Sequence, residues 1–96
     1  MRSSKHIFRG VEYEIQFTAK GLTDKQDGLC DCPDKNENCV IIIRPGRSQL
    51  RQLTLLIHEM AHATNYHKLS EEDVEESAED IAKALFKLGW RKTGDF

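Results

Sequence analysis

Long apolar runs, an excess of basic residues and an export signal are all missing from this chain. No segment approaches the roughly 20 apolar residues that a membrane-spanning helix needs. Lys and Arg number 14 and Asp and Glu number 16, so the formal net charge is −2 and nothing favours binding to nucleic acid or to a membrane. The start, Met1 to His6, is not followed by the apolar stretch of a signal peptide. We therefore expect a soluble, cytoplasmic protein of open oligomeric state.

Cysteine is also scarce, because the chain has only Cys30, Cys32 and Cys39, all within ten residues. Their odd number and the missing export signal favour reduced thiols. A second zinc site is an alternative, although Cys-x-Cys with a third cysteine is not a common structural-zinc spacing. The residues that could complete such a site are Asp31, Asp34 and His6. The simplest interpretation is a loop or hairpin that carries thiols.

The 96 residues suit a single domain, residues 1–96, with a modest core. Three stretches show the alternating or β-branched pattern of strands. They are Ile7–Phe17, with a break or turn near Arg9-Gly10, a short strand at Leu29–Cys32, and Cys39–Ile43. The last is almost entirely apolar, so we expect it to be covered on both faces.

Two helices are predicted after the strands. The first runs from Gln49 to about His67, with Ser48 as its cap, and is so apolar in its middle that it needs cover on two sides. The second follows Ser70 with an acidic first turn and ends near Gly89. The short connection between them makes them antiparallel neighbours. The sequence thus predicts an α+β fold, a small antiparallel or mixed sheet packed on an active-site helix and a second antiparallel helix.

The first predicted helix carries the chemically informative motif His58-Glu59-Met60-Ala61-His62. Histidines four residues apart share a helix face, so both imidazoles can bind one Zn²⁺ ion. Glu59 would lie beside the metal as a candidate general base. The alternative is a buried helix whose histidines are merely hydrogen-bonded, but unpaired imidazoles and a carboxylate cost free energy in apolar surroundings.

A catalytic zinc site needs a third protein ligand. In an antiparallel helix pair, His62 faces about residue 75 and His58 about residue 79, and Glu75 lies at the edge of the apolar stripe. We therefore predict Glu75 as the third ligand, with Glu79 as the second choice. Glu71 has a suitable angle but sits at the helix end, low for the metal. The alternative is that Glu75 is an ordinary carboxylate at the flank of the helix, or a partner to a histidine.

Tyr66 and His67 follow the motif directly. His67 is five residues after His62, so it leaves the helix face of the motif, and a position at the helix end suits it better. Either side chain could donate a hydrogen bond to a developing oxyanion.

The motif and the helix after it resemble the zincin metallopeptidases, specifically very small gluzincins. The matching segments are Leu56-Ile57-His58-Glu59-Met60-Ala61-His62-Ala63 and Val74-Glu75-Glu76-Ser77-Ala78-Glu79-Asp80-Ile81-Ala82. They are similar to minigluzincin domains, ImmA/IrrE-type peptidases and compact phage-encoded metallopeptidases, and the resemblance covers roughly residues 40 to 90. It implies Zn²⁺ as cofactor, with His58, His62 and Glu75 as ligands and Glu59 activating the zinc-bound water that hydrolyses a peptide bond.

The resemblance also implies a peptide or protein substrate, held in extended form by the strand next to the active-site helix, here Val40–Ile43. Its apolarity equally suits a buried central strand. The first functional hypothesis is therefore a zinc-dependent peptidase, with the tail Trp90–Phe96 as a candidate autoinhibitory segment. The alternative is a non-catalytic zinc-binding regulatory or interaction domain, favoured by the small size of the chain. A metal-free helical interaction protein is the third hypothesis.

Overall fold

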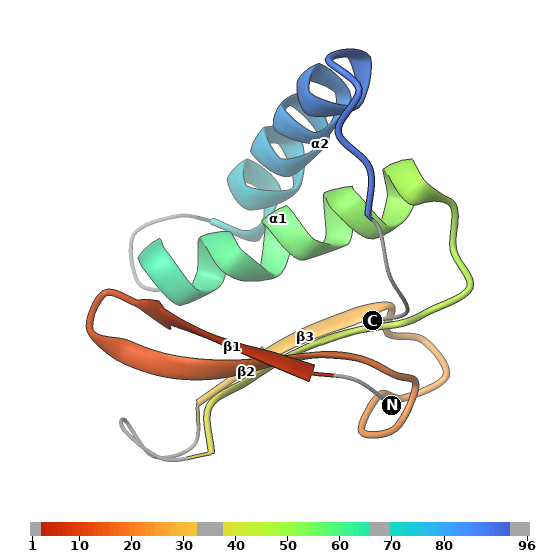
Figure 1. Cartoon of the computed structure of the whole chain (residues 1–96). Helices are drawn as coiled ribbons and strands as arrows, with labels where there is room; N and C mark the ends of the chain where they lie inside the picture. The colour runs from red at the N-terminus through yellow and green to blue at the C-terminus, as the bar shows by residue number, and fades with distance from the viewer. Residues whose placement is uncertain (1–2, 33–37, 66–69, 93–96) are drawn as a thin grey trace.

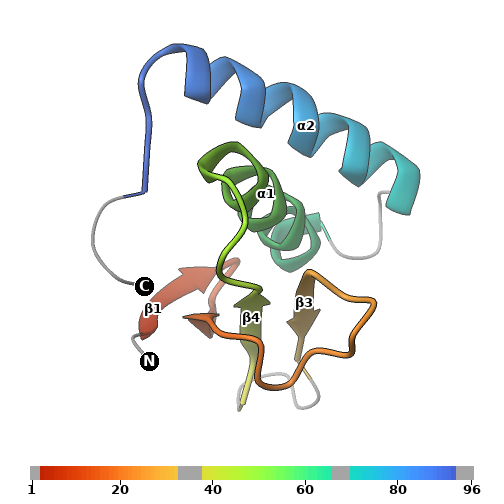
Figure 2. The same cartoon turned by 90° about the vertical axis from the view of Figure 1, so that its right-hand side faces the viewer.

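A computed structural model describes residues 3–32, 38–65 and 70–92 of this protein. Four strands come first and two helices follow, as the sequence predicts for an α+β fold (Figure 1). The elements are β1 (Ser3–Phe8), β2 (Val11–Phe17), β3 (Gly28–Asp31), β4 (Val40–Ile43), α1 (Gln49–Asn65) and α2 (Glu71–Lys87). The sheet, α1 and α2 form three successive layers, and α1 is the middle one (Figures 1 and 2).

The strands form one mixed sheet in the order β1-β2-β4-β3. β2 and β4 are parallel, whereas the β1–β2 and β3–β4 pairs are antiparallel. The predicted strand Ile7–Phe17 is in fact divided between β1 and β2, because Arg9 and Gly10 both take positive φ angles, 50° and 82°. Two consecutive positive φ angles form a tight two-residue turn, and the backbone twist of such a turn matches the twist of the two strands that it joins. The Arg9 side chain then donates to the carbonyl of Thr64 near the end of α1, at 2.8 Å.

Strand β4 lies inside the sheet, paired with β2 on one side and with β3 on the other. Ile41 and Ile43 are completely buried on the face that carries the main core cluster, and Ile42 is buried on the opposite face. A Cβ on Gly21 would lie 3.1 Å from the Ile42 side chain, so the loop before β3 packs against that second face. The predicted cover on both faces is confirmed. The expectation that Val40–Ile43 holds a substrate by edge pairing is wrong, because both of its edges are already paired.

Helix α1 packs on β1, β3 and β4, whereas α2 packs on α1 alone among the described elements. Figure 2 views α1 nearly end-on while α2 runs across it, so the two helices cross obliquely. The buried residues of α2 are Val74, Ala78 and Ala82, all small enough for close approach to α1. The predicted cap is confirmed, since the Ser70 hydroxyl accepts from the backbone N–H of Asp73 at 3.1 Å. Gly89, with φ at 97°, ends the helix as predicted.

The cysteines differ from the prediction of three reduced thiols. Cys32 and Cys39 form a disulfide, with Cα atoms 4.0 Å apart, and Cys30 is a free thiol. The register explains the pairing, because the antiparallel strands β3 and β4 place these two cysteines opposite each other just beyond Asp31 and Val40. A disulfide removes two of the three thiolates that the alternative second zinc site would need. Within the described residues, no helix is both long and apolar enough to cross a membrane.

The central strand should carry much of the stability of this fold. We expect Ile41→Ala to lower the free energy of unfolding by about 2–5 kcal/mol, because it leaves a cavity under α1. The matched control is Ile7→Ala at a site that is 61% exposed, with an expected loss below about 1 kcal/mol. Urea unfolding followed by circular dichroism measures both. Equal losses for the two variants would contradict the assigned core.

Candidate metal centre

His58 and His62 lie one turn apart on α1 and direct their side chains to the same side of the helix. Their Nε2 atoms are 3.2 Å apart, and the ring centroids are separated by 4.9 Å. A tetrahedral zinc ion at about 2.0 Å from each of two nitrogens holds those nitrogens about 3.3 Å apart. The histidine pair therefore already has the spacing that one shared ion requires. His58 is buried and His62 is half-buried, so the pair faces the interior between α1 and α2.

Glu71, the first residue of α2, brings a carboxylate to both histidines. Its Oε1 lies 2.7 Å from Nε2 of His58, and its Oε2 lies 3.0 Å from Nε2 of His62. Potential ligand atoms of these three residues all fall within 4.8 Å of one another. The Glu71 side chain is 71% exposed, so this group opens to solvent on the side of α2. Two imidazoles and a carboxylate beside solvent are a donor set typical of catalytic zinc.

Glu75 occupies a different position from the one predicted for it. Its Oε2 lies 2.9 Å from Nδ1 of His58, on the opposite edge of the ring from Glu71, and its Oε1 lies 3.9 Å from Nη1 of Arg51. The helical-wheel prediction assumed two helices side by side at matching levels. In the structure α2 crosses α1 obliquely (Figure 2), and it is Glu71 in the first turn of α2 that contacts the histidine Nε2 atoms. Glu71 thus joins the group of possible ligands, whereas the role of Glu75 as third ligand stays a prediction.

The other candidates for the third ligand do not enter the group. Glu79, the second choice, is exposed on α2 and is not part of the cluster found among the described residues. His6 lies on β1, where its ring contacts Phe8. Tyr66 and His67 lie outside the described residues, so their predicted hydrogen bonds to an oxyanion stay predictions.

Glu59 points toward the sheet rather than toward α2. It is 7% exposed, and a Cβ added to Gly28 would lie only 2.8 Å from its Oε2. Burial raises the pKa of Glu59 to about 7; the nearby His58 opposes this rise, while Glu71 and Glu75 add to it. A carboxyl group that changes protonation near neutral pH can both accept and return a proton under ordinary conditions. The predicted base therefore sits in an environment suited to proton transfer.

Gly28 is a functional position that the sequence did not reveal. It begins β3, and any larger residue there would push against the Glu59 carboxylate. A glycine at the start of a short predicted strand has many explanations, so no local pattern distinguishes this one. Arg51 was also missed, although its position seven residues before His58 places it on the same face of α1.

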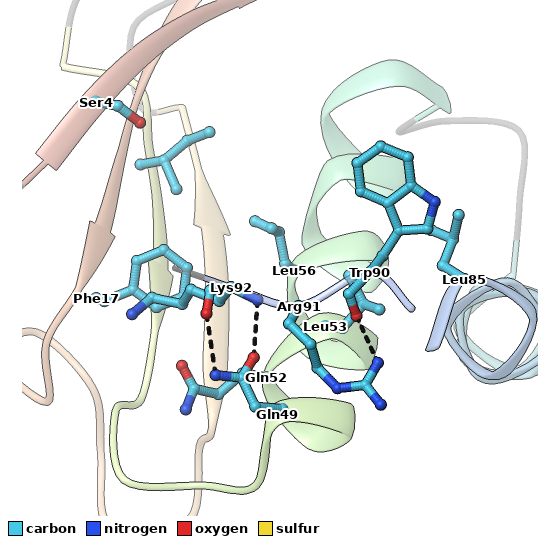
Figure 3. Close-up of a pocket in the computed structure, with 11 residues that line it drawn as sticks. Ser4, Phe17, Gln49, Gln52, Leu53, Leu56, Leu85, Trp90, Arg91 and Lys92 are labelled. Atoms are coloured by element: carbon cyan, nitrogen blue, oxygen red, sulfur yellow. Dashed lines mark hydrogen bonds between the residues drawn. The ribbon is translucent and has the colours of Figure 1, made fainter. Parts of the chain in front are cut away.

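A pocket of about 570 Å³ lies elsewhere, between β2, α1 and the segment that follows α2. Figure 3 shows Trp90 and Leu85 on one side of it and Phe17 on the other. None of the motif residues from His58 to His62 lines this pocket. Gln49 exchanges two hydrogen bonds with the backbone of Lys92, which ties the described part of the tail to the start of α1. Whether the tail is autoinhibitory stays a prediction, since residues 93–96 lie outside the described part.

Comparison with known proteins does not assign a family to this chain. No protein-family model matches it, and no curated protein and no solved structure matches it at a significant level. The chemistry of the centre is therefore inferred from its own residues.

The thiol of Cys30 gives a test of the packing between β3 and α1. Burial, with smaller contributions from the charges of Glu59 and Asp31, raises its pKa to about 12. Because the thiolate is the reactive form, native protein at pH 8 should react with iodoacetamide roughly a thousandfold more slowly than the unfolded chain. The native rate should also rise about tenfold for each pH unit between 7 and 9. Mass spectrometry of non-reduced protein, with and without urea, measures both rates. Native labelling within tenfold of the unfolded rate would contradict this burial.

Proposed function

We propose that this protein is a zinc-dependent peptidase in which His58, His62 and Glu71 hold the metal and Glu59 is the general base. The observation that carries the proposal is the 3.2 Å separation of two imidazole Nε2 atoms, with one carboxylate facing both and a buried carboxyl group on the residue after His58. Histidine nitrogen and carboxylate oxygen are the ligands that zinc takes in hydrolytic enzymes. The metal and the activity are inferences from this donor set.

The residues of the centre fit a zinc ion by chemistry and by spacing. Glu71 lies at 2.7 and 3.0 Å from the two nitrogens, distances of direct hydrogen bonds, so its carboxylate withdraws by only a few tenths of an ångström to share an ion with them. Glu75 faces Nδ1 of His58, which keeps a proton on that nitrogen and leaves Nε2 free to bind metal. Arrangements in which a carboxylate orients a ligating histidine are common in zinc enzymes.

The proposed hydrolysis combines the chemistry of a bound zinc ion with proton transfer by Glu59. A bound zinc ion supplies Lewis acidity, which polarises a carbonyl group and makes water more acidic. Glu59 accepts the proton of the attacking water on a carboxylate oxygen and passes it to the nitrogen of the departing amine. Burial raises the pKa of Glu59 in the metal-free protein, which favours its protonated, donating form, whereas a bound cation would favour its ionised, accepting form.

The outer edge of β3 is the best candidate for binding the substrate backbone. β3 pairs only with β4 among the described strands, so its other edge is open for an additional extended chain. A Cβ on Gly28, at its start, would lie 2.8 Å from Oε2 of Glu59, so the proposed base packs against this same edge strand. This assignment replaces the internal strand β4 that the sequence suggested.

A non-catalytic zinc domain is the alternative on the same fold, and the small size of the chain favours it. The buried Glu59 carboxyl favours the enzyme. Burying an ionisable group costs free energy, and a zinc site that serves only to bind a partner gains nothing from a carboxyl group that changes protonation near pH 7.

Zinc binding tests the ligand set. We expect His58→Ala and His62→Ala to abolish stoichiometric zinc, and Glu71→Ala to lower zinc affinity more than 100-fold, because each removes a ligand. Glu75→Ala should cost about 10–100-fold, the usual effect of removing a partner that orients a ligand. The control is Glu72→Ala on the exposed side of the same turn, with no change. Competition with a chromogenic chelator gives the affinities. A larger loss from Glu75→Ala than from Glu71→Ala would return Glu75 to the role of third ligand.

Hydrolysis tests the base. Glu59→Gln should keep full zinc content but lose at least about 100-fold in cleavage rate, because the amide cannot accept the proton. The assay is cleavage of a heat-denatured protein mixture by zinc-loaded protein, with a chelator control, followed by mass spectrometry of new termini. If the zinc-loaded parent protein cleaves nothing, the non-catalytic domain is the correct alternative. Equal cleavage by the parent and Glu59→Gln would remove Glu59 from the mechanism.

A further inference from the structure

Three arginines gather around one carboxylate at the start of β3. Asp27, which directly precedes Gly28, lies 3.3 Å from Nε of Arg44, 3.0 Å from Nη2 of Arg47 and 3.8 Å from Nη2 of Arg51. We call these three arginines the arginine cluster. The hydrogen bond from Arg47 and the charges of all three hold the pKa of Asp27 below its usual range, so Asp27 is ionised at neutral pH. It neutralises only one of the three positive charges.

Among the described residues, the three guanidinium groups pair with two carboxylates, Asp27 and Glu75, the latter at 3.9 Å from Arg51. A third carboxyl group, that of the buried Glu59, lies against Gly28. The first turn of α1 contains no acidic residue. The Ser48 hydroxyl accepts from the backbone N–H of Arg51, and the N-terminal end of the helix dipole contributes further positive potential at the same end. This end of the β3 edge is therefore electropositive in a protein whose net charge is negative.

The three arginines differ in their exposure and in how many of their donors are already used within the fold. Arg44 donates to the carbonyls of Thr23 and Gln26 and is 19% exposed, so it secures the loop before β3. Arg47 and Arg51 are 45% and 43% exposed. Arg51 reaches its two carboxylates only at 3.8 and 3.9 Å, longer than hydrogen bonds. Both exposed guanidinium groups thus keep donors for a further carboxylate, which arginine binds in a two-pronged geometry.

The arginine cluster lies on the path of a peptide bound to the β3 edge. Arg51 precedes His58 by two helical turns, about 11 Å along α1, and Glu75 contacts both side chains. An extended peptide covers that distance with about three residues. Glu59 lies closer to the cluster, because a Cβ on Gly28, the residue after Asp27, would lie 2.8 Å from its Oε2, so the span from the base to the arginines is at most about three residues. β3 runs from Asp27 away toward Asp31, so a peptide pairing antiparallel to it would present its C-terminal side to the arginines.

We propose that Arg47 and Arg51 bind a carboxylate group of the substrate peptide, one to about three residues to the C-terminal side of the cleaved bond. This inference rests on the proposed peptidase function and adds a substrate class to it. The carboxylate has two sources, the C-terminus of the substrate or an Asp or Glu side chain, and peptides can distinguish them.

The test uses fluorescence-quenched peptides built on a sequence that zinc-loaded protein cleaves in the denatured mixture. One set places Asp, Asn, Lys or Ala at each position on both sides of the cleaved bond. A second set ends one, two or three residues after that bond with either a free or an amidated C-terminus. We expect a carboxylate at one of these three positions to raise kcat/KM at least tenfold over its amide, through a lower KM. Preference in the first set indicates a side chain, and preference in the second a terminus.

The variants Arg47→Gln and Arg51→Gln should each remove most of this preference, and Arg47→Gln should leave cleavage of uncharged peptides within about twofold. Arg47→Gln is the cleaner of the two, because Arg47 has no described contact with Glu75 or the histidines. The control is Arg91→Gln, which changes an arginine stacked on Phe86 away from the β3 edge. Zinc content and thermal unfolding of each variant confirm that the centre and the fold are intact.

A binding measurement separates failure of this proposal from failure of the peptidase function. Fluorescence anisotropy with zinc-loaded Glu59→Gln protein reports the carboxylate preference without catalysis and without a known cleavage site, on labelled alanine-based peptides that carry Asp or Asn and a free or amidated C-terminus. Cleavage by the parent without any carboxylate preference overturns the arginine proposal and leaves the peptidase function standing. Carboxylate-dependent binding lost in Arg47→Gln, with no cleavage by the parent, supports the binding role and rejects the peptidase. Neither cleavage nor carboxylate-dependent binding overturns both.

Discussion

Packing of α1 between the sheet and α2 is the constraint on which the candidate centre depends. Leu55, Glu59 and Ala63 form one row on α1, and the two apolar members belong to the core cluster of the sheet. His58 is one residue and about 100° away from Glu59, so it faces α2 instead. One helix thus directs its carboxylate to Gly28 on β3 and its imidazoles to Glu71 on α2. A shift or rotation of α1 would separate all of these groups at once.

Burying polar groups costs free energy, and the buried ionisable side chains of α1 lie against α2 and β3. His58 is buried, with carboxylates of α2 at both ring nitrogens, at 2.7 and 2.9 Å. Glu59 is buried against β3, and the desolvation of its carboxyl group raises its pKa to about 7. An apolar helix would have been easier to bury in a chain of this size. Three ionisable side chains, His58, Glu59 and His62, nevertheless lie in the middle layer. Their presence is the physical reason to infer chemistry there rather than at the apolar pocket near Trp90.

Charge is arranged along the same helix. The arginine cluster lies in and just before its first turn, and its second half faces the acidic first turn of α2, with Glu75 between Arg51 and His58. β3, which follows Asp27 of the cluster and packs on α1, is an edge strand of the sheet. If a peptide occupies this edge, its backbone meets the strand, its cleaved bond meets Glu59 and a carboxylate on it meets the arginines. A single exposed strand of four residues would then set position, direction and charge preference.

Local sequence determined the secondary-structure elements and the histidine pair of the candidate centre. The caps, the Arg9-Gly10 turn, the apolar β4 and the pairing of His58 with His62 depend on neighbours within a few residues, and helical and strand periods then fix which side chains share a face. Tertiary structure decided that Glu71 rather than Glu75 meets both Nε2 atoms, that β3 rather than β4 has an open edge, and that Cys32 pairs with Cys39. Those outcomes depend on the crossing angle of two helices and on strand order. Both are set by how side chains from distant segments pack, and no spacing along the chain contains that information.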